Sequence, residues 1–264
     1  MVINPKFQRL TLLTGLDAAE ALGRCRVIVF GIGGVGSWCA EALVRSGVGS
    51  VSIVDSDTVC VTNINRQVQA TSSTIGRLKT EVLEKRLREI NPDCEVTSFP
   101  KVFSLETAGE FGVSEADYVI DAIDSLTNKL DLIETAATGG TTLFSSMGTA
   151  QKLDPTLLKT ADIWETEGCP LARLVRQGLR KRGFEGRFTV VYSSEQLPLR
   201  RDIPATCGSA QCLCPPRDRG DPGGPVEWCS SKKVINGSAV TVTAAAGMIL
   251  ASLVIRDIYA RYAP

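Results

Sequence analysis

Short apolar runs alternate with longer amphipathic stretches along the first half of the chain. The apolar runs lie at 27–30, 51–55 and 118–122, and their length and content of branched residues are typical of buried strands. We expect two further strands at 95–99 and 142–147. The stretches at 37–48, 78–90 and 127–138 repeat apolar residues at helical spacing. Strands and helices that alternate with short connections predict a right-handed, doubly wound and mostly parallel α/β sheet.

The segment before the first run has a helical pattern of its own. Within 5–23, Phe7, Leu10 and Leu13 recur close to helical spacing. We expect a short helix that packs outside the sheet and leaves Arg9 free.

The pattern changes after Gly148. We expect antiparallel strands at 152–155 and 187–192, which flank a helix at 171–182. Residues 193–231 are rich in Pro, Gly and Cys and predict a long loop. A final helix is expected at about 244–259. The sheet is therefore expected to carry antiparallel additions in its C-terminal part.

One stretch imitates a membrane span. Residues 238–255 carry no charge, but they are rich in Ala, Thr and Ser, and they open with the extended pattern Val-Thr-Val-Thr. We expect a buried strand-to-helix segment and no membrane association. The first 15 residues lack the apolar core of a signal peptide, which indicates a cytoplasmic protein.

A glycine cluster follows the first apolar run. Gly31, Gly33 and Gly36 satisfy the pattern G-x-G-x-x-G, with Gly34 inside it. Glycines allow a sharp turn and the close approach of a phosphate to the amides that open a helix. Asp55 closes the second run 19 residues after Gly36, which suits a carboxylate that holds a ribose hydroxyl. The pattern is Rossmann-like and predicts nucleotide binding, without separating a dinucleotide from ATP.

Composition narrows the chemistry. Of 264 residues, 29 are basic and 29 acidic, so the formal net charge is zero, and any nucleic-acid contact requires a local basic patch. The chain contains no histidine. Histidine triads, histidine bases and histidine metal sites are therefore excluded, and catalysis must use carboxylates, Lys, Arg, Cys or the groups of a substrate.

Further polar residues stand where strands of such a sheet end. Triphosphates require cations and a magnesium ion, which basic side chains and a carboxylate at these positions would supply, whereas dinucleotides require fewer such groups. The set therefore favours ATP with Mg²⁺. Its members are Asp55, Asp57, Asn63, Arg66, Gln67, Lys79 and Asp124.

These motifs together resemble the MoeB/ThiF and ubiquitin-activating enzymes, which adenylate a carboxylate with ATP and magnesium. The resemblance rests on GIGGVGS, DSDTV, NINRQ, Lys79 and DAIDS, between about residues 7 and 147. It implies that Asp55 binds the ribose and that Asp124 holds magnesium. It implies that Arg9 reaches into the ATP site of a partner subunit, hence a homodimer. The resemblance also implies phosphate contacts from Asn63, Arg66 and Lys79, and Gln67 is expected to belong to the same nucleotide-binding site.

The second half is most similar to the tRNA threonylcarbamoyladenosine dehydratase group, through SSMGTAQKLDPT, CPLARLVRQGLRKRG and INGSAVTVTAAAG. The resemblance implies an enzyme that adenylates the carboxylate of threonylcarbamoyladenosine at position 37 of tRNA and promotes ring closure with release of AMP. Whether the ring is a hydantoin or an oxazolone stays open. We expect a single domain over 1–264, with a nucleotide-binding core at 1–150 and a substrate, tRNA and dimerisation part at 151–264.

A basic cluster supports the tRNA prediction. Between 169 and 201 the chain has eight basic and two acidic residues. Arg173, Arg176 and Arg180 recur at helical spacing and would offer one face to phosphates. A solvated helix face without a partner is the alternative.

The nine cysteines leave two questions open. Cys207, Cys212, Cys214 and Cys229 could form an irregular zinc site or remain free thiols. Cys169 stands near the position of the thioester cysteine of protein-activating relatives, or simply begins a helix.

Other functions compete with the tRNA reading. One is adenylation of a small ubiquitin-like sulfur carrier, as in molybdopterin or thiamine synthesis, with a cysteine desulfurase or sulfur-acceptor system as partner. It is disfavoured by the missing CxxC pairs and by the basic helix. A nicotinamide-dependent oxidoreductase, or a nucleotide sensor without catalysis, would leave Arg66, Lys79 and Asp124 unexplained.

Overall fold

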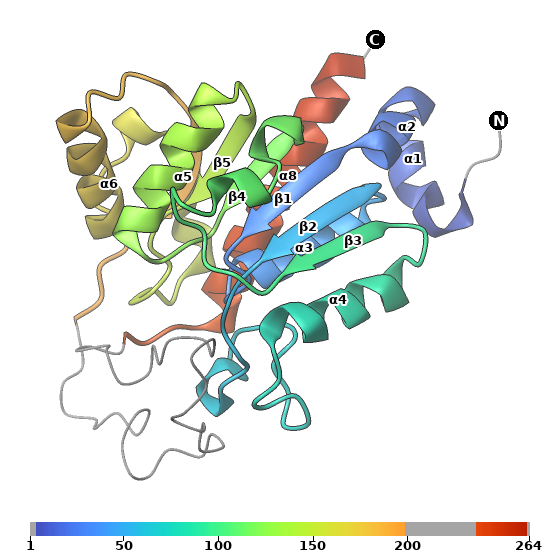
Figure 1. The fold of residues 1–264 in the computed structure, drawn as a ribbon, viewed down its shortest axis with the longest axis horizontal. Helices are drawn as coiled ribbons and strands as arrows, with labels where there is room; N and C mark the ends of the chain where they lie inside the picture. Colours follow the sequence, from blue (N-terminus) through green and yellow to red (C-terminus); the bar gives the residue numbers. More distant parts are fainter. Residues whose placement is uncertain (1–3, 199–235, 263–264) are drawn as a thin grey trace.

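A seven-stranded sheet forms the centre of the molecule in the computed structural model, which describes residues 4–198 and 236–262 (Figure 1). All neighbouring strands are parallel except the last pair, in which β6 runs antiparallel to β7. The predicted mostly parallel sheet with an antiparallel addition is confirmed. Its order is β3 (Glu95–Phe99), β2 (Ser50–Val54), β1 (Arg26–Phe30), β4 (Tyr118–Asp121), β5 (Thr142–Ser146), β7 (Thr189–Ser193) and β6 (Leu158–Asp162).

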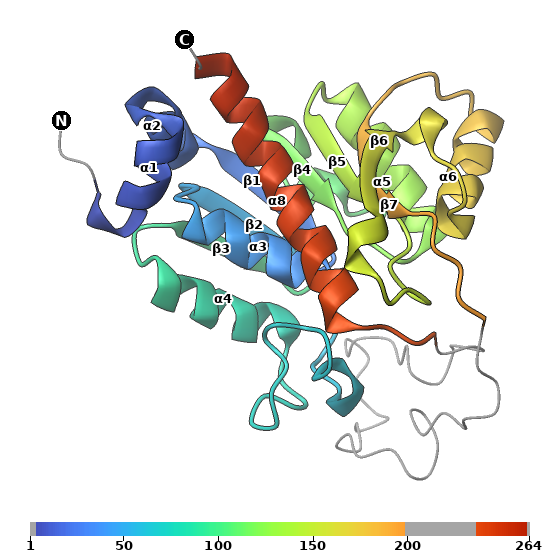
Figure 2. The ribbon, with the colours of Figure 1, turned by 180° about the vertical axis from the view of Figure 1, so that it is seen from behind.

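Helices cover both faces of the sheet, as Figures 1 and 2 show. Each face buries its own hydrophobic cluster, so the fold has three layers. The first face carries α1 (Gln8–Thr14), α2 (Leu16–Arg24), α3 (Gly36–Arg45), α4 (Lys79–Ile90) and α8 (Val240–Tyr262). The second face carries α5 (Leu126–Thr138) and α6 (Pro170–Lys181).

Short 3₁₀ helices shape several of the connections between these elements. They are η1 (Pro5–Phe7), η2 (Val61–Asn63), η3 (Ala108–Glu110), η4 (Val113–Glu115), η5 (Pro155–Leu157) and η6 (Ile163–Glu165). The segment η2 follows β2 and lies below the lower edge of the sheet in Figure 1.

Helix α8 is the one helix of the described residues long and apolar enough to cross a membrane. In the structure it packs along α3 across the first face of the sheet (Figure 2). The side chains of Val242, Leu250 and Val254 are fully buried there. A Cβ on Gly247 would lie 2.4 Å from the Val35 carbonyl oxygen, so glycine permits this close contact. The helix therefore acts as a core helix, as the buried alternative predicted.

The expected extended opening of this segment is wrong. Val240 to Thr243 are already helical. Their branched side chains favour strands locally, but Val242 and Thr243 are buried, and the side chain of Thr243 lies against Gly34. Tertiary packing thus outweighs the local preference.

Two other boundaries differ from the sequence prediction. The N-terminal helix divides into α1 and α2 at Gly15, where φ is 86°. The strand expected at 152–155 is found at 158–162 instead. Asp154 accepts a hydrogen bond from the Thr156 amide and Pro155 opens η5, so this stretch turns before β6 begins.

Candidate functional site

The glycine turn joins β1 to α3 at the carboxyl edge of the sheet. Gly31 has a φ of 81°, and a Cβ there would lie 2.7 Å from the Ala122 carbonyl oxygen. A Cβ on Gly36 would lie 1.9 Å from the Gly31 carbonyl oxygen. Neither position can carry a side chain without moving the backbone. The turn is therefore compact enough for a phosphate to approach the amides at the start of α3.

Asp55 holds the turn from the end of β2. Its Oδ2 accepts a hydrogen bond from the Ile32 amide at 3.0 Å, and its Oδ1 accepts one from the Asp57 amide at 2.9 Å. The side chain is 11% exposed. These bonds fix the carboxylate beside the glycine turn.

Lys79 opens α4 and faces this carboxylate. Its Nζ lies 2.7 Å from Asp57 Oδ2 and 3.7 Å from Asp55 Oδ1, and the Lys79 side chain is 6% exposed. The main-chain amide of Lys79 also donates to the Asp57 carbonyl at 3.0 Å. The start of α4 is therefore joined to the loop after β2 by a side-chain ion pair and by a main-chain hydrogen bond, both between Lys79 and Asp57.

The charges of the site control its titration. Burial disfavours the ammonium of Lys79, but the Asp55 and Asp57 carboxylates outweigh burial, so the pKa of Lys79 is raised above 10.5. Burial raises the pKa of the Asp55 carboxyl above 3.8, and Lys79 opposes that rise. Lys79 thus keeps its positive charge at neutral pH, as a ligand for a phosphate group requires.

Asp124 stands three residues beyond β4 with an exposed side chain. Its charge contributes to the raised pKa of Lys79, so the end of β4 and the start of α4 lie within electrostatic reach. The described residues contain no group of three or more acidic or Cys side chains that could hold a metal ion. Mg²⁺ commonly uses one or two carboxylates together with substrate phosphates. A single carboxylate at Asp124 fits that habit.

A buried ion pair supports the loop that carries Asp124. Lys129 Nζ lies 2.6 Å from Asp121 Oδ2, and both side chains are 0% exposed. Lys129 also donates to Ser145 Oγ at 3.3 Å, and Asp121 Oδ1 accepts from the Ile123 amide at 3.1 Å. The network links α5, β4 and β5 directly below the loop.

The loop from η2 to residue 70 covers the glycine turn. Arg66 packs so closely over Gly34 that a Cβ there would lie 3.3 Å from Arg66 Cδ. Its Nη1 donates to the Thr62 carbonyl at 2.7 Å. Asn63 Oδ1 accepts from the Cys60 amide at 3.0 Å, which engages the oxygen of that carboxamide.

Two glutamines of this loop contain buried oxygens. Gln69 Nε2 donates to the Ile32 carbonyl at 2.8 Å, while the Oε1 atoms of Gln67 and Gln69 have no hydrogen-bond partner in the described structure. An unpaired buried carboxamide oxygen is unfavourable in free energy, so these two oxygens are suited to accept hydrogen bonds from a bound ligand.

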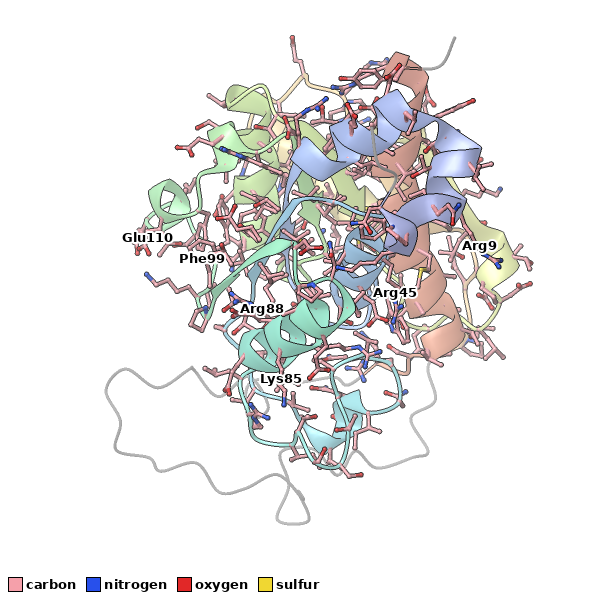
Figure 3. The ribbon with its side chains drawn as sticks, turned by 90° about the vertical axis from the view of Figure 1, so that its right-hand side faces the viewer. Arg9, Arg45, Lys85, Arg88, Phe99 and Glu110 are labelled. Carbon is pink, nitrogen blue, oxygen red and sulfur yellow. The ribbon has the colours of Figure 1, made fainter. Side chains whose placement is uncertain are left out.

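A cavity of about 560 Å³ opens beyond Asp55, toward the end of β3. Ser56, Leu78, Val102 and Glu110 are among its lining residues. Figure 3 shows Glu110 close to Phe99, the last residue of β3.

Arg9 is not brought to this group. It is exposed on α1, and in Figure 3 it lies on the opposite side of the molecule from Phe99 and Glu110. The neighbouring Lys6 bonds Asp93, just before β3, so this end of the chain lies at the amino ends of the strands. The glycine turn lies at the carboxyl ends of the strands, so Arg9 is not grouped with Asp55, Lys79 and Asp124 in the described structure.

The arginines of α6 are only partly available. Arg173 is exposed, Arg176 donates to the Thr166 hydroxyl, and the Arg180 guanidinium lies 5.4 Å from the centre of the Trp164 ring. Cys169 is 3% exposed and belongs to the hydrophobic cluster of the second face, which supports a structural role. Cys207, Cys212, Cys214 and Cys229, with most of the expected 193–231 loop, lie outside the described residues.

Sequence reasoning missed Gln69, Asp121 and Lys129. A signal for the last one exists, because Lys129 shares its helical phase with Ile133 and Ala136, which are both fully buried. A charged residue on an apolar helix face indicates a buried partner.

The ThiF family model matches residues 7–261, nearly the whole chain. The protein belongs to the ThiF family. The family resemblance predicted from the motifs is thereby confirmed.

Individual relatives narrow the comparison within this family. The chain is 41% identical over 205 residues to the tRNA threonylcarbamoyladenosine dehydratase of Bacillus subtilis (strain 168), covering 77% of this chain and 81% of that protein. It is 33% identical over 258 residues to the Escherichia coli (strain K12) dehydratase, covering 95% and 92%. The crystal structure of the E. coli enzyme in complex with ATP matches with a TM-score of 0.80 and 31% identity, over 100% of this chain and 99% of that one.

Proposed function

We propose that the protein is an ATP-dependent tRNA threonylcarbamoyladenosine dehydratase. The observation that carries the proposal is the grouping of Asp55, Lys79 and Asp124 around the glycine turn, in a chain similar over nearly its full length to an enzyme of that name. That enzyme has been crystallised with ATP and with AMP.

The site offers a route for ATP along the carboxyl edge of the sheet. The adenine enters the cavity beyond Ser56, the ribose hydroxyls meet Asp55, and the phosphates lie against the amides that open α3. Asn63, Arg66, Gln67 and Lys79 surround the phosphates. Asp124 is the carboxylate that would hold Mg²⁺, which when bound neutralises charge that develops on the phosphate oxygens.

The reaction then proceeds in two steps. A carboxylate oxygen of the threonylcarbamoyl group attacks the α-phosphorus of ATP, and pyrophosphate leaves with the electron pair of the broken P–O bond. A nucleophilic atom of the same side chain attacks the activated acyl carbon and loses its proton, and AMP leaves as the ring closes. The tRNA loses one water overall.

Little enzyme chemistry is required for the ring closure. The nucleophile is tethered to the acyl group, and such arrangements reach effective concentrations of roughly 10⁵–10⁸ M. The chain needs only to bind the phosphates, orient the side chain and exclude water. This requirement fits a protein with no histidine.

The tRNA backbone binds along α6 in this proposal. Arg173 is exposed in the first turn of the helix, and Leu171 lies next to Gly148, just past the end of β5. Arg176 donates to the Thr166 hydroxyl and the Arg180 guanidinium lies over the Trp164 ring. The helix thus supplies a positive surface next to the strand ends.

A homodimer completes the ATP site in this proposal, with Arg9 acting on the site of the second subunit. The support is the position of the segment that carries Arg9 at the amino ends of the strands, away from the edge that carries the glycine turn, and the exposure of large apolar side chains on α1 and α8. Leu12 and Leu13 on α1 are 76% and 77% exposed, and Met248 on α8 is 43% exposed. A second copy would cover such surfaces. The sulfur-acceptor partner stays a prediction.

Mass spectrometry of nucleosides tests the function. We expect tRNA that carries threonylcarbamoyladenosine to yield a product one water lighter when incubated with the protein, ATP and Mg²⁺, with one AMP released per product. Asp124→Asn should fold normally and form no product. Formation of an acyl-adenylate on a sulfur carrier with a Gly-Gly tail, without any change in the tRNA, would support the alternative and refute the proposal.

A further inference from the structure

The order of the strands places the residues of the candidate ATP site in a row along the carboxyl edge of the sheet. The end of β3 borders the cavity, β2 leads to Asp55, β1 leads to the glycine turn and β4 leads to Asp124. The next strand in this order is β5. In the proposed route for ATP the adenine takes the other end of the row, so the carboxylate that attacks the phosphate would approach from beyond Asp124. The loop that follows β5, residues 147–151, stands at that position.

Gln151 ends this loop in an unusual conformation. Its φ is 57°, and it is the single residue other than glycine with a positive φ in the described chain. A left-handed backbone conformation is unfavourable in free energy for a residue with a long side chain, so the surroundings must hold Gln151 in it. Such strained positions cluster at ligand sites, where they aim a side chain.

The side chain of Gln151 is available for a ligand. It is half-buried, and its carboxamide makes no hydrogen bond to any other described residue. Its Nε2 lies beside Gly237, where a Cβ would be 3.5 Å away. Within the described residues, the carboxamide therefore keeps two donors and one acceptor oxygen unused.

Hydrogen bonds connect the 147–151 loop, through residues 236–239, to the loop from η2 to residue 70. The Gln151 amide donates to the Gly237 carbonyl at 2.9 Å, and Asn65 Nδ2 donates to the Ser238 carbonyl at 2.9 Å. Thr243, shortly after these residues, lies against Gly34. Residues 236–239 thus connect Gln151 with the residue next to Arg66, and they hold Gln151 at the rim of the ATP site.

We propose that Gln151 is a specificity-determining residue that binds the carbamoyl group of the substrate. The group is a substituted urea, with a carbonyl acceptor and N–H donors, and a carboxamide can pair with a urea through two hydrogen bonds. Gln151 would hold the urea while the attached carboxylate extends toward the phosphates. The inference rests on the proposed function, and it identifies Gln151 as the residue that recognises the threonylcarbamoyl group of the tRNA.

The backbone conformation provides a matched pair of variants. Glycine accepts a φ of 57° without strain, so Gln151→Gly removes the side chain and keeps the loop. Gln151→Ala removes the same side-chain atoms past Cβ but keeps the strain. We expect both variants to lose about 10- to 100-fold in kcat/KM for the modified tRNA, since two hydrogen bonds of ordinary strength are lost.

Other readouts separate recognition from structure. The Kd for ATP and the thermal midpoint of Gln151→Gly should match those of the parent. If the parent converts the modified tRNA and Gln151→Gly converts it equally fast, the role of Gln151 is overturned and the proposed function stays intact. A fall in ATP affinity and melting temperature together with turnover would make Gln151 a structural residue and would also overturn the proposal. A parent without dehydratase activity would remove the proposed function and this inference together.

Discussion

Replacing Lys129 with Met removes a buried charge and keeps most of the side-chain volume. In the parent, the Lys129 ammonium donates to Asp121 Oδ2 at 2.6 Å and to the Ser146 carbonyl at 3.1 Å. The substitution leaves the Asp121 carboxylate with two hydrogen bonds, from the Ser145 hydroxyl at 2.6 Å and the Ile123 amide at 3.1 Å. The side chain of Asp121 is 0% exposed, so water cannot replace the lost cation.

The expected cost follows from this geometry. Removing one partner of a buried ion pair destabilises a protein by about 3–5 kcal/mol, because the other charge stays buried. A change of 1 kcal/mol lowers the melting temperature of a domain of this size by roughly 2–4 °C. We therefore expect Lys129→Met to melt about 6–20 °C below the parent. ATP turnover should fall as well, because the Asp121 carboxylate, which accepts from the Ile123 amide in the loop that carries Asp124, loses its ammonium partner.

Urea unfolding followed by circular dichroism measures the effect. Lys85→Met is the matched control, because Lys85 is exposed on α4 (Figure 3), and we expect it to change the unfolding free energy by less than about 0.5 kcal/mol. The double variant Lys129→Met with Asp121→Asn should be less destabilised than the two single effects added together, since no net charge remains. A loss below about 1 kcal/mol for Lys129→Met would refute the reasoning.

Four further predictions concern the turn, the titration, the dimer and the tRNA. Gly36→Ala should abolish ATP binding measured by calorimetry, because its Cβ would lie 1.9 Å from the Gly31 carbonyl oxygen; unchanged affinity would contradict the role of the turn. Burial opposes ionisation of Glu41, but hydrogen bonds from Arg86 and Arg45 outweigh it and hold its pKa below 4.5. The stability advantage of the parent over Glu41→Gln should thus be full above pH 4.5 and shrink as the pH falls through the folded-state pKa, whereas a pH-independent difference in urea unfolding would refute this. Mixed dimers of inactive Arg9→Ala and inactive Asp124→Asn subunits should regain activity at a minority of sites, and inactivity of proven heterodimers would place Arg9 outside the site. Replacing the three arginines of α6 with Gln should weaken tRNA binding and reduce the slope of log affinity against log salt concentration by up to about 0.7–0.9 per lost phosphate contact. ATP affinity should be unchanged, and equal tRNA affinity and slope would mean a solvated face. These three are Arg173, Arg176 and Arg180.

The sequence by itself determined the sheet and the grouping of the residues that form the candidate nucleotide site. Parallel strands buried on both faces require nearly continuous apolar runs, so the runs at 27–30 and 118–122 could be recognised without any partner. Glycines and acids that directly follow such runs must meet at the carboxyl edge, because parallel strands end on the same side. Asp55 and the glycine turn therefore lie in contact, as their order in the chain predicted.

Only the tertiary structure decided the features that depend on distant contacts. The Val-Thr-Val-Thr segment became helix because Val242 and Thr243 are buried, with Thr243 packed against Gly34 in the turn before α3. Lys129 could be seen to occupy an apolar helix phase, but its partner is set by the neighbouring strands β4 and β5. The strain at Gln151 likewise depends on residues 236–239, which approach the loop only in the folded chain. Local patterns specify elements, whereas the pairing of buried polar groups depends on which elements become neighbours.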